Sequence, residues 1–547
     1  MKKTLVFMCG ILLIFAAGCG TIRGKDSSNN VTILTAGLVA TPTDANDPYK
    51  KWIKDNYNLN VTLIASSSFS TQALLKFSDK VPPEVVSFND VTGFNRIFNQ
   101  GVLLSDWTPY LDKMPNIKRI IEKEDADRPG KDSIAKLMMT SDGKLNGLWM
   151  TPNPPTWSLK IREDWAASFR QTPGNEDWTP DSPEALLKFA RWIKSDNPGG
   201  GPGEGRAYGF SSVGFGIHLG TLSQWAALMY GAVHVLPWGV YVNDDNEADF
   251  GILDGNHKKT LDFIRTLVRE ELIEPNWYVQ SEADWINTKK GRIGIEWYPG
   301  VLSAETQKYQ DSRGVDSTNW WKTYPVPKDP DSKYGGYQSS DGFLGKIITV
   351  SAIAANDAAK MDKICKLIND VAFYMDDEKD GAEKYVRTAA YDALCWGIGV
   401  EESIETKPIT GTDQTYLYTK EGTKPYRETY PGARDWGVWF SANKDGIIAG
   451  ETQEISDVSR KVIEHDAVTA TYRRRLQLGG VLRLDADKIN ELTSMTYTFE
   501  YNYVTEKFGG KTAEQFYNEF KSAWIAQGGT QLMAEADRQF LRLGFKV

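Results

Sequence analysis

The chain has 547 residues, which is enough for roughly two to four domains and a large buried core. Apolar residues make up 41% and charged residues 25%, so the composition is globular and excludes a disordered protein. The formal net charge is −9, from 63 basic and 72 acidic side chains, which argues against nucleic acid as a partner because phosphate binding needs a basic face. The 18 Trp are the unusual feature of the composition.

The N-terminus predicts a secreted protein with a lipid anchor. A basic start and an apolar stretch, Leu5–Ala17, are typical of a signal peptide over residues 1–18, and the stretch is shorter than the roughly 20 residues that span a bilayer. Ala16–Gly18 directly before Cys19 resembles a bacterial lipobox, which implies cleavage before Cys19 and lipid on its thiol. Residues 19–30 then read as a polar tether, so we expect an extracytoplasmic body held at the cell membrane. A plain secreted protein cut nearby is the alternative.

Strand and helix patterns alternate after the tether. We expect strands at 31–35, 60–65 and 83–88 and helices at 48–57 and 71–77, the first helix with Asp47 as its N-cap. This β-α-β-α-β order predicts a parallel sheet with right-handed crossovers. Ligands bind outside the carboxyl ends of such strands, and the loop Phe88-Asn89-Asp90 follows one of these ends.

The rest of the chain adds further helices and strands without an internal repeat, which argues against propellers and solenoids. We expect helices at 182–195, 257–271, 358–375 and 511–543 and strands at 291–297 and 346–351. Cys365 and Cys395 remain once the N-terminal cysteines are assigned, and a disulfide between them is open. Cys365 lies in an apolar helical pattern, which favours a small core residue.

The motifs of metal sites and of common enzymes are missing from the sequence. The four His are scattered, and no H-E-x-x-H or paired-Cys motif exists, so we expect no metal and no cofactor. Asp244–Asn246 begins like a calcium loop, but Ala248 breaks the ligand spacing. Gly510–Thr512 ends like a phosphate-binding loop, but Thr505 stands where that loop needs glycine. Carboxylates are plentiful enough for the acid pair of a glycosidase, but the sequence singles out no such pair and no catalytic residue.

The abundant aromatic side chains fit a carbohydrate ligand. Trp offers a flat apolar face and one N–H donor, which match the C–H face and the hydroxyl rim of a sugar ring. Indoles next to Gly, Pro and polar residues are the better candidates, because loops of this composition lie at the surface. By this criterion the platform candidates are Trp157, Trp225, Trp297, Trp396 and Trp436.

Several motifs point to one family. Pro82–Asp90, followed by Gly101–Leu104, resembles the first-lobe segment of solute-binding proteins of sugar ABC importers. Asp142–Leu148 is similar to the stretch before the first hinge crossing of that family, and Arg162–Trp165 is similar to its entry into the second lobe. Lys290–Ile295 resembles the segment that precedes a sugar-stacking Trp in the family. The order of these motifs makes the resemblance specific over most of the chain before residue 400.

The resemblance implies a maltose-binding-protein-like α/β fold, the periplasmic binding protein type II architecture. Each of two lobes would hold a mainly parallel sheet flanked by helices, with hinge segments between them. Residues 31–152 and about 335–405 would form the first lobe, and residues 153–334 and about 406–547 the second. The C-terminal third departs most from the family and looks enlarged.

The resemblance also implies a function. The protein would be no enzyme but a monomeric lipoprotein that captures a sugar, by its size an oligosaccharide, and delivers it to an ABC permease. The expected ligand contacts are Phe88, Asn89, Asp90, Trp157, Gln224, Trp225, Trp297, Tyr298, Trp396 and Trp436. Structural roles compete for three of them: a helix N-cap for Asp90, a helix face for Trp225 and a core strand position for Trp297.

Two other functions share parts of the pattern. A glycan-capturing outer-membrane lipoprotein of the helical-repeat type would have the same anchor, acidity and Trp content, but it would be mostly helical. A secreted carbohydrate-active enzyme would need a carboxylate pair whose loss stops turnover.

Overall fold

The computed structural model describes the chain in a series of separate stretches. These are residues 29–36, 46–66, 69–78, 82–88, 91–127, 143–149, 157–199, 205–212, 219–231, 240–242, 248–252, 255–279, 292–299, 320–339, 346–372, 374–377, 383–386, 388–395, 397–399, 404–408, 415–419, 433–440, 447–448, 468, 474–475 and 484–542. The predicted signal peptide and Cys19 lie outside them.

The first sheet has five strands in the order β2-β1-β3-β12-β4. They are β1 Asn30–Ala36, β2 Asn60–Ser66, β3 Val85–Phe88, β4 Leu148–Trp149 and β12 Ile347–Val350. β1 is parallel to both β2 and β3, which confirms the expected β-α-β-α-β unit. β12 is antiparallel to β3 and to β4, so β4 runs in the same direction as the first three strands.

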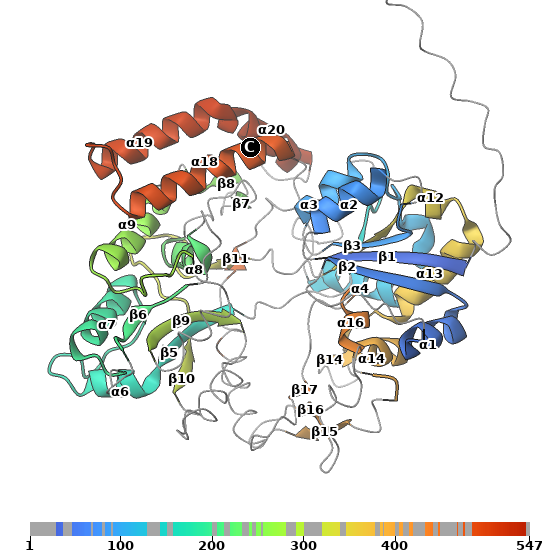
Figure 1. The fold of residues 1–547 in the computed structure, drawn as a ribbon, viewed down its shortest axis with the longest axis horizontal. Coiled ribbons are helices and arrows are strands. Elements are labelled where there is room, and N and C mark those ends of the chain that lie inside the picture. Colours follow the sequence, from blue (N-terminus) through green and yellow to red (C-terminus); the bar gives the residue numbers. More distant parts are fainter. Residues whose placement is uncertain are drawn as a thin grey trace, which may run out of the picture.

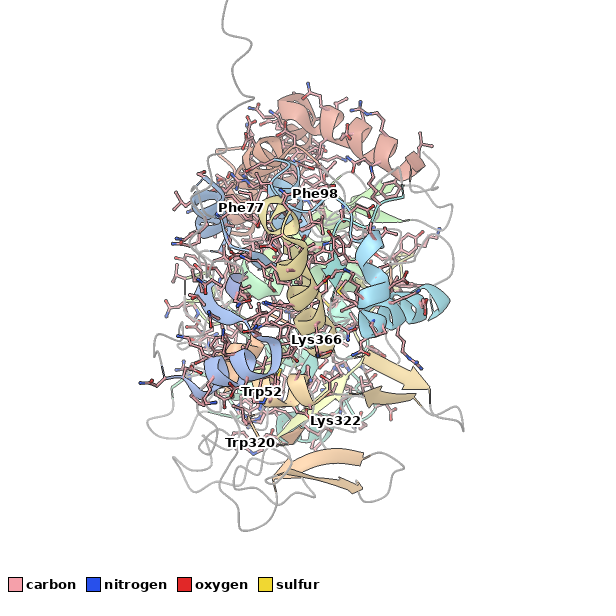
Figure 2. All side chains as sticks on the ribbon, turned by 90° about the vertical axis from the view of Figure 1, so that its right-hand side faces the viewer. Trp52, Phe77, Phe98, Trp320, Lys322 and Lys366 are labelled. Carbon is pink, nitrogen blue, oxygen red and sulfur yellow. The ribbon has the colours of Figure 1, made fainter. Side chains whose placement is uncertain are left out.

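Helices pack around this sheet, and we call the sheet with these helices the first lobe. They are α1 Pro48–Tyr57, α2 Phe69–Ser78, α3 Val91–Phe98, α4 Pro115–Asp127, α12 Ala352–Ala355, α13 Ala358–Asp370, α14 Ala389–Cys395, α16 Ala433–Gly437 and a 3₁₀ helix Thr108–Lys113. Asp47 is the N-cap of α1, as predicted, and its carboxylate accepts the N–H groups of Tyr49 and Lys50. Figure 2 shows Phe77 of α2 and Phe98 of α3 together at the top of this lobe, where both pack against its core.

The second sheet has four strands in the order β10-β5-β9-β6. They are β5 Trp157–Arg162, β6 Tyr208–Phe210, β9 Ile293–Pro299 and β10 Trp321–Tyr324. β9 is parallel to β6, while β5 is antiparallel to both β9 and β10. Three of the four strands therefore share one direction, and the strand expected at 291–297 is the central β9.

Helices on this second sheet form the second lobe. They are α6 Glu163–Arg170, α7 Pro183–Asp196, α8 Gly220–Tyr230, α9 Asn256–Arg269, α18 Ala486–Val504, α19 Ala513–Trp524 and α20 Thr530–Arg542. α18 and α19 add the end of the chain to the core of this lobe through Phe499, Tyr517 and Phe520. His257 of α9 contacts both helices: its Nε2 lies 3.1 Å from Glu500 Oε1 of α18, and its Nδ1 lies 3.1 Å from the Tyr517 hydroxyl of α19. The C-terminal helices α18–α20 therefore enlarge the second lobe.

Short strands complete the described structure. They are β7 Val240–Val242, β8 Ala248–Phe250, β11 Gln338–Ser339, β13 Tyr374–Asp377, β14 Glu383–Val386, β15 Ile404–Pro408, β16 Thr415–Thr419, β17 Ile447–Ile448 and β18 Arg474–Arg475. Cys365 and Cys395 are buried and form no disulfide with each other, and burial raises the pKa of the Cys365 thiol to about 11. Within the described stretches, no helix has the length and apolar character needed to cross a membrane.

The end of the chain differs from the expectation in two places. Trp436, Trp439 and Phe440 pack in the core of the first lobe, whereas residues 406–547 were all expected in the second. The helix expected over 511–543 is broken between α19 and α20 by a wider turn, Ile525–Gly529. Gly528 has a φ of 127° there, a conformation that side-chain-bearing residues rarely adopt. The chain therefore kinks at this glycine, and α19 and α20 are two helices although the apolar pattern reads as one.

Candidate functional site: two facing sheet edges

The two lobes lie side by side with the carboxyl ends of their parallel strands turned toward each other (Figure 1). In the first lobe these ends are Ala36 of β1, Ser66 of β2 and Phe88 of β3. In the second lobe they are Phe210 of β6 and Pro299 of β9, with Trp157 at the start of antiparallel β5 beside them. Ligands of open α/β sheets bind at such ends, so these two edges are the candidate site.

Phe88, the last residue of β3, packs into the core directly beneath the sheet edge of the first lobe. Its ring is fully buried and meets Phe69 and Phe94 edge to face, with centroid distances of 5.1 and 5.5 Å. Such T-shaped contacts are a favoured arrangement of packed aromatic rings. Phe88 was expected to contact a ligand, and in this conformation it is a core residue that anchors the end of β3.

Lys346 lies on the same edge and was not among the expected residues. It directly precedes β12, and its Nζ donates a hydrogen bond of 2.8 Å to the carbonyl of Ala36 at the end of β1. Because β3 lies between β12 and β1, the lysine side chain passes over the end of Phe88's strand. Burial lowers the pKa of Lys346 to about 8. A Lys before an apolar strand is the signal in the sequence, but its meaning depends on strand direction, which the sequence does not reveal.

Trp297 and Trp225 stack inside the second lobe. Their ring centroids lie 6.2 Å apart at an interplanar angle of 20°, and Phe210 stacks on Trp225 at 5.8 Å. Trp225 is on α8 with Leu222, so the helix-face role is the one that the structure supports. Trp297 is also buried, on the side of β9 that faces this helix. The stack joins the ends of β6 and β9, and neither indole presents an open face in this conformation.

Polar side chains border this stack. Glu274 is buried beyond the end of β6, where its N–H bonds the Phe210 carbonyl at 3.0 Å and its carboxylate accepts the N–H of Asn276. Burial raises the pKa of Glu274. Ser212 follows β6 and its hydroxyl accepts the N–H of Leu222 in α8 at 3.0 Å. Ser212 thus fixes the entry into α8, and both side chains set hydrogen-bonding oxygens near the edge, although no motif in the sequence marks them.

Trp436 belongs to the first lobe. It is fully buried, and its Nε1 donates to the Asp47 carboxylate at 3.0 Å, the same carboxylate that caps α1. Close packing of α16 on α14 depends on Gly437, where a Cβ would lie 2.9 Å from Cys395 Sγ. Trp436 therefore ties a distant part of the chain to the start of α1, a structural role in place of the expected platform.

The other expected contacts are described in part or not at all. Trp157 and Tyr298 lie near each other on paired strands, since Trp157 is opposite Pro299 and Ser158 is opposite Tyr298. Gln224 is in α8. Asn89, Asp90 and Trp396 lie outside the described residues. In the stretches that the structure covers, no group of three or more His, Cys, Asp or Glu side chains is placed to hold a metal ion.

Comparison with known proteins identifies the fold. No protein-family model matches the chain, and no curated protein matches it. Among solved structures it is similar to an HMO binding ABC-transporter associated solute binding protein from Bifidobacterium longum infantis, with a TM-score of 0.64 and 14% identity over 95% of this chain and 100% of that one.

Two further structures have similar scores. The S. pneumoniae ABC-transporter substrate binding protein FusA, an EF-hand mutant in complex with fructo-nystose, has a TM-score of 0.60 and 15% identity over 93% of this chain and 98% of its own. The alginate-binding protein AlgQ2 without calcium ion has a TM-score of 0.60 and 14% identity over 94% and 98% of the two chains. The chain therefore has the two-lobed α/β fold of ABC-transporter solute-binding proteins. The two α/β sheets exclude the helical-repeat alternative.

Proposed function

We propose that this protein captures a saccharide, an oligosaccharide by the size of the chain, between the two facing sheet edges and delivers it to an ABC permease. The observation that carries this proposal is that the two edges face each other in a chain with the solute-binding-protein fold. The similar structures are named for HMO binding and alginate binding or contain fructo-nystose, so saccharides are the ligand class to test first. A ligand that touches both lobes would favour a closed state about the hinge.

The two hydrophobic cores indicate which residues belong to each lobe. We propose a first lobe of residues 31–152 and about 335–405 that also includes residues 433–440, because Trp436 and Trp439 pack in its core. The second lobe comprises residues 153–334 and includes the C-terminal helices 484–542. The mature chain would act as a monomer outside the cytoplasm, anchored through a lipid on Cys19.

A thermal-shift screen against mono- and oligosaccharides tests the function. Binding to the native state raises the melting temperature by mass action, and a receptor returns its ligand unchanged. Chromatography of the recovered ligand separates a receptor from a carbohydrate-active enzyme, which would yield shorter products. No shift with any saccharide, or cleavage of the ligand, contradicts the proposal.

Trp297→Ala tests the site in the second lobe, with Trp178→Ala as its matched control. The two indoles are 6% and 7% exposed, so both variants lose a similar amount of packing. Trp178 contacts Phe169 and Phe189 between α6 and α7, on the side of the lobe where β5 ends. We expect Trp297→Ala to weaken saccharide affinity by at least about tenfold, since Trp297 packs beneath the end of β9 and its loss would disturb the candidate edge. Equal affinities of the two variants would remove Trp297 from the site.

A further inference from the structure

Three lysines are nine-tenths buried in the part of the chain that the structure describes: Lys160 at 2%, Lys346 at 6% and Lys360 at 8% exposure. Two of them have a carboxylate beside them. Lys360 Nζ lies 3.0 Å from Glu84 Oε1 in an ion pair. Lys160 lies directly opposite the buried Glu296 in the pairing of β5 with β9. The Lys360 ammonium is therefore compensated within its own lobe, and Lys160 Nζ donates a hydrogen bond to the Ser158 hydroxyl.

Lys346 differs from the other two. Its Nζ donates to the carbonyl of Ala36, and among the described residues no carboxylate forms an ion pair with it. An ammonium carries three donors, so within the described residues the carbonyl of Ala36 leaves two of them, and the charge itself, without a partner of opposite sign. A buried charge without such a partner is costly.

The Lys346 ammonium lies at the sheet edge that belongs to the candidate site. Ile347 is opposite Phe88 in the register of β12 with β3, so Lys346 stands in the first row beyond the end of β3. From there its side chain reaches Ala36, the last residue of β1. The ammonium thus lies across the carboxyl ends of the first sheet, on the edge that faces the second lobe.

We propose that Lys346 receives an anionic group of the ligand, so that the captured saccharide carries a carboxylate or a sulfate. A carboxylate and a sulfate both offer anionic oxygens, which would accept the two remaining N–H groups and neutralise the buried charge. The inference rests on the proposed function and narrows it from saccharides in general to acidic ones.

The first test needs no ligand. Lys346→Met keeps the aliphatic stem and removes a buried charge that no described carboxylate compensates, so we expect an unchanged or higher melting temperature. Lys360→Met is the matched control in the same lobe; it leaves the partly buried Glu84 without its cationic partner and lowers the melting temperature. A loss of stability in Lys346→Met as large as that of the control would show a structural lysine and overturn the inference.

The second test uses neutral, uronate and sulfated trisaccharides of matched backbone and linkage, in galactose, glucose and mannose series. Isothermal titration calorimetry compares the wild-type protein with Lys346→Met. We expect at least one uronate or sulfated member to bind, its neutral counterpart to bind more weakly, and Lys346→Met to lose about ten- to a hundredfold in affinity for the acidic member. The uronate and sulfate arms tell the two anionic groups apart.

The outcomes separate this inference from the proposed function. Tight binding of a neutral trisaccharide, unaffected by Lys346→Met, overturns the inference and leaves a saccharide receptor in place. Binding of an acidic member that Lys346→Met does not weaken likewise removes Lys346 from the site. If no trisaccharide of any series binds, both the function and the inference fall.

Discussion

The stability of the protein near pH 9 should depend on the Lys346 ammonium. Its pKa is lowered from about 10.5 in an unfolded chain to about 8 by burial, so between these values the unfolded chain binds more protons than the native one. The free energy of unfolding therefore rises with pH. Burial of the charged lysine lowers it by about 3 kcal/mol below pH 8, and this loss is gone above pH 10.5.

Urea unfolding of wild-type protein and Lys346→Met from pH 7 to pH 10.5 measures this effect. The free-energy advantage of the variant is expected to shrink steadily as the pH rises, because the wild-type lysine becomes neutral. Since other groups titrate equally in both proteins, the difference isolates this lysine. A constant difference over the range would mean that the ammonium is solvated in the native state.

Two buried indoles three residues apart provide a matched pair for the structural role of residues 433–440. Trp436 Nε1 bonds Asp47, whereas Trp439 Nε1 is buried without a hydrogen-bond partner in the described structure. Trp436→Phe should therefore destabilise the protein by about 1–3 kcal/mol more than Trp439→Phe, since it also leaves the Asp47 carboxylate one donor short. Chemical denaturation measures both, and equal losses would deny the Trp436–Asp47 bond a role.

At the scale of elements, α18 and α19 join the second lobe through a buried polar contact. His257 bonds Glu500 of α18 and Tyr517 of α19, and all three side chains are buried. Glu500→Leu removes the carboxylate and leaves the imidazole nitrogen unpaired, which should lower the free energy of unfolding by about 1–3 kcal/mol. Glu500→Gln keeps an acceptor and should lose less. If both variants unfold at the same urea concentration as the wild type, the contact does not hold these helices.

The order of elements in the first lobe was predictable because its signals are local. Asp47 before Pro48 marks a helix start, and β-branched runs such as Val61–Ile64 mark strands. The break at Gly528 and the burial of Trp436 were not, because both depend on distant partners: Lys488 packs where a Cβ of Gly528 would lie, and Asp47 is 389 residues from Trp436. Proximity to Gly and polar residues therefore predicted exposed indoles where tertiary contacts bury them.

For the whole molecule, the proposed lipid anchor on Cys19 would decide where the protein works. Cys19→Ala should abolish lipid attachment and release the protein from the membrane fraction into the soluble fraction. Metabolic labelling with a radioactive fatty acid and fractionation of expressing cells measure both effects. Cys365→Ala is the control, since that thiol is buried in the core and should leave labelling intact. A Cys19→Ala protein that stays labelled would place the lipid elsewhere.

Capture of a ligand between the sheet edges requires two lobes that close on it. Small-angle X-ray scattering of the protein, with and without a saturating saccharide from the thermal-shift screen, measures this directly. The radius of gyration should fall on binding, because a ligand that contacts both edges favours the closed state. An unchanged radius of gyration at saturation would contradict capture between the lobes.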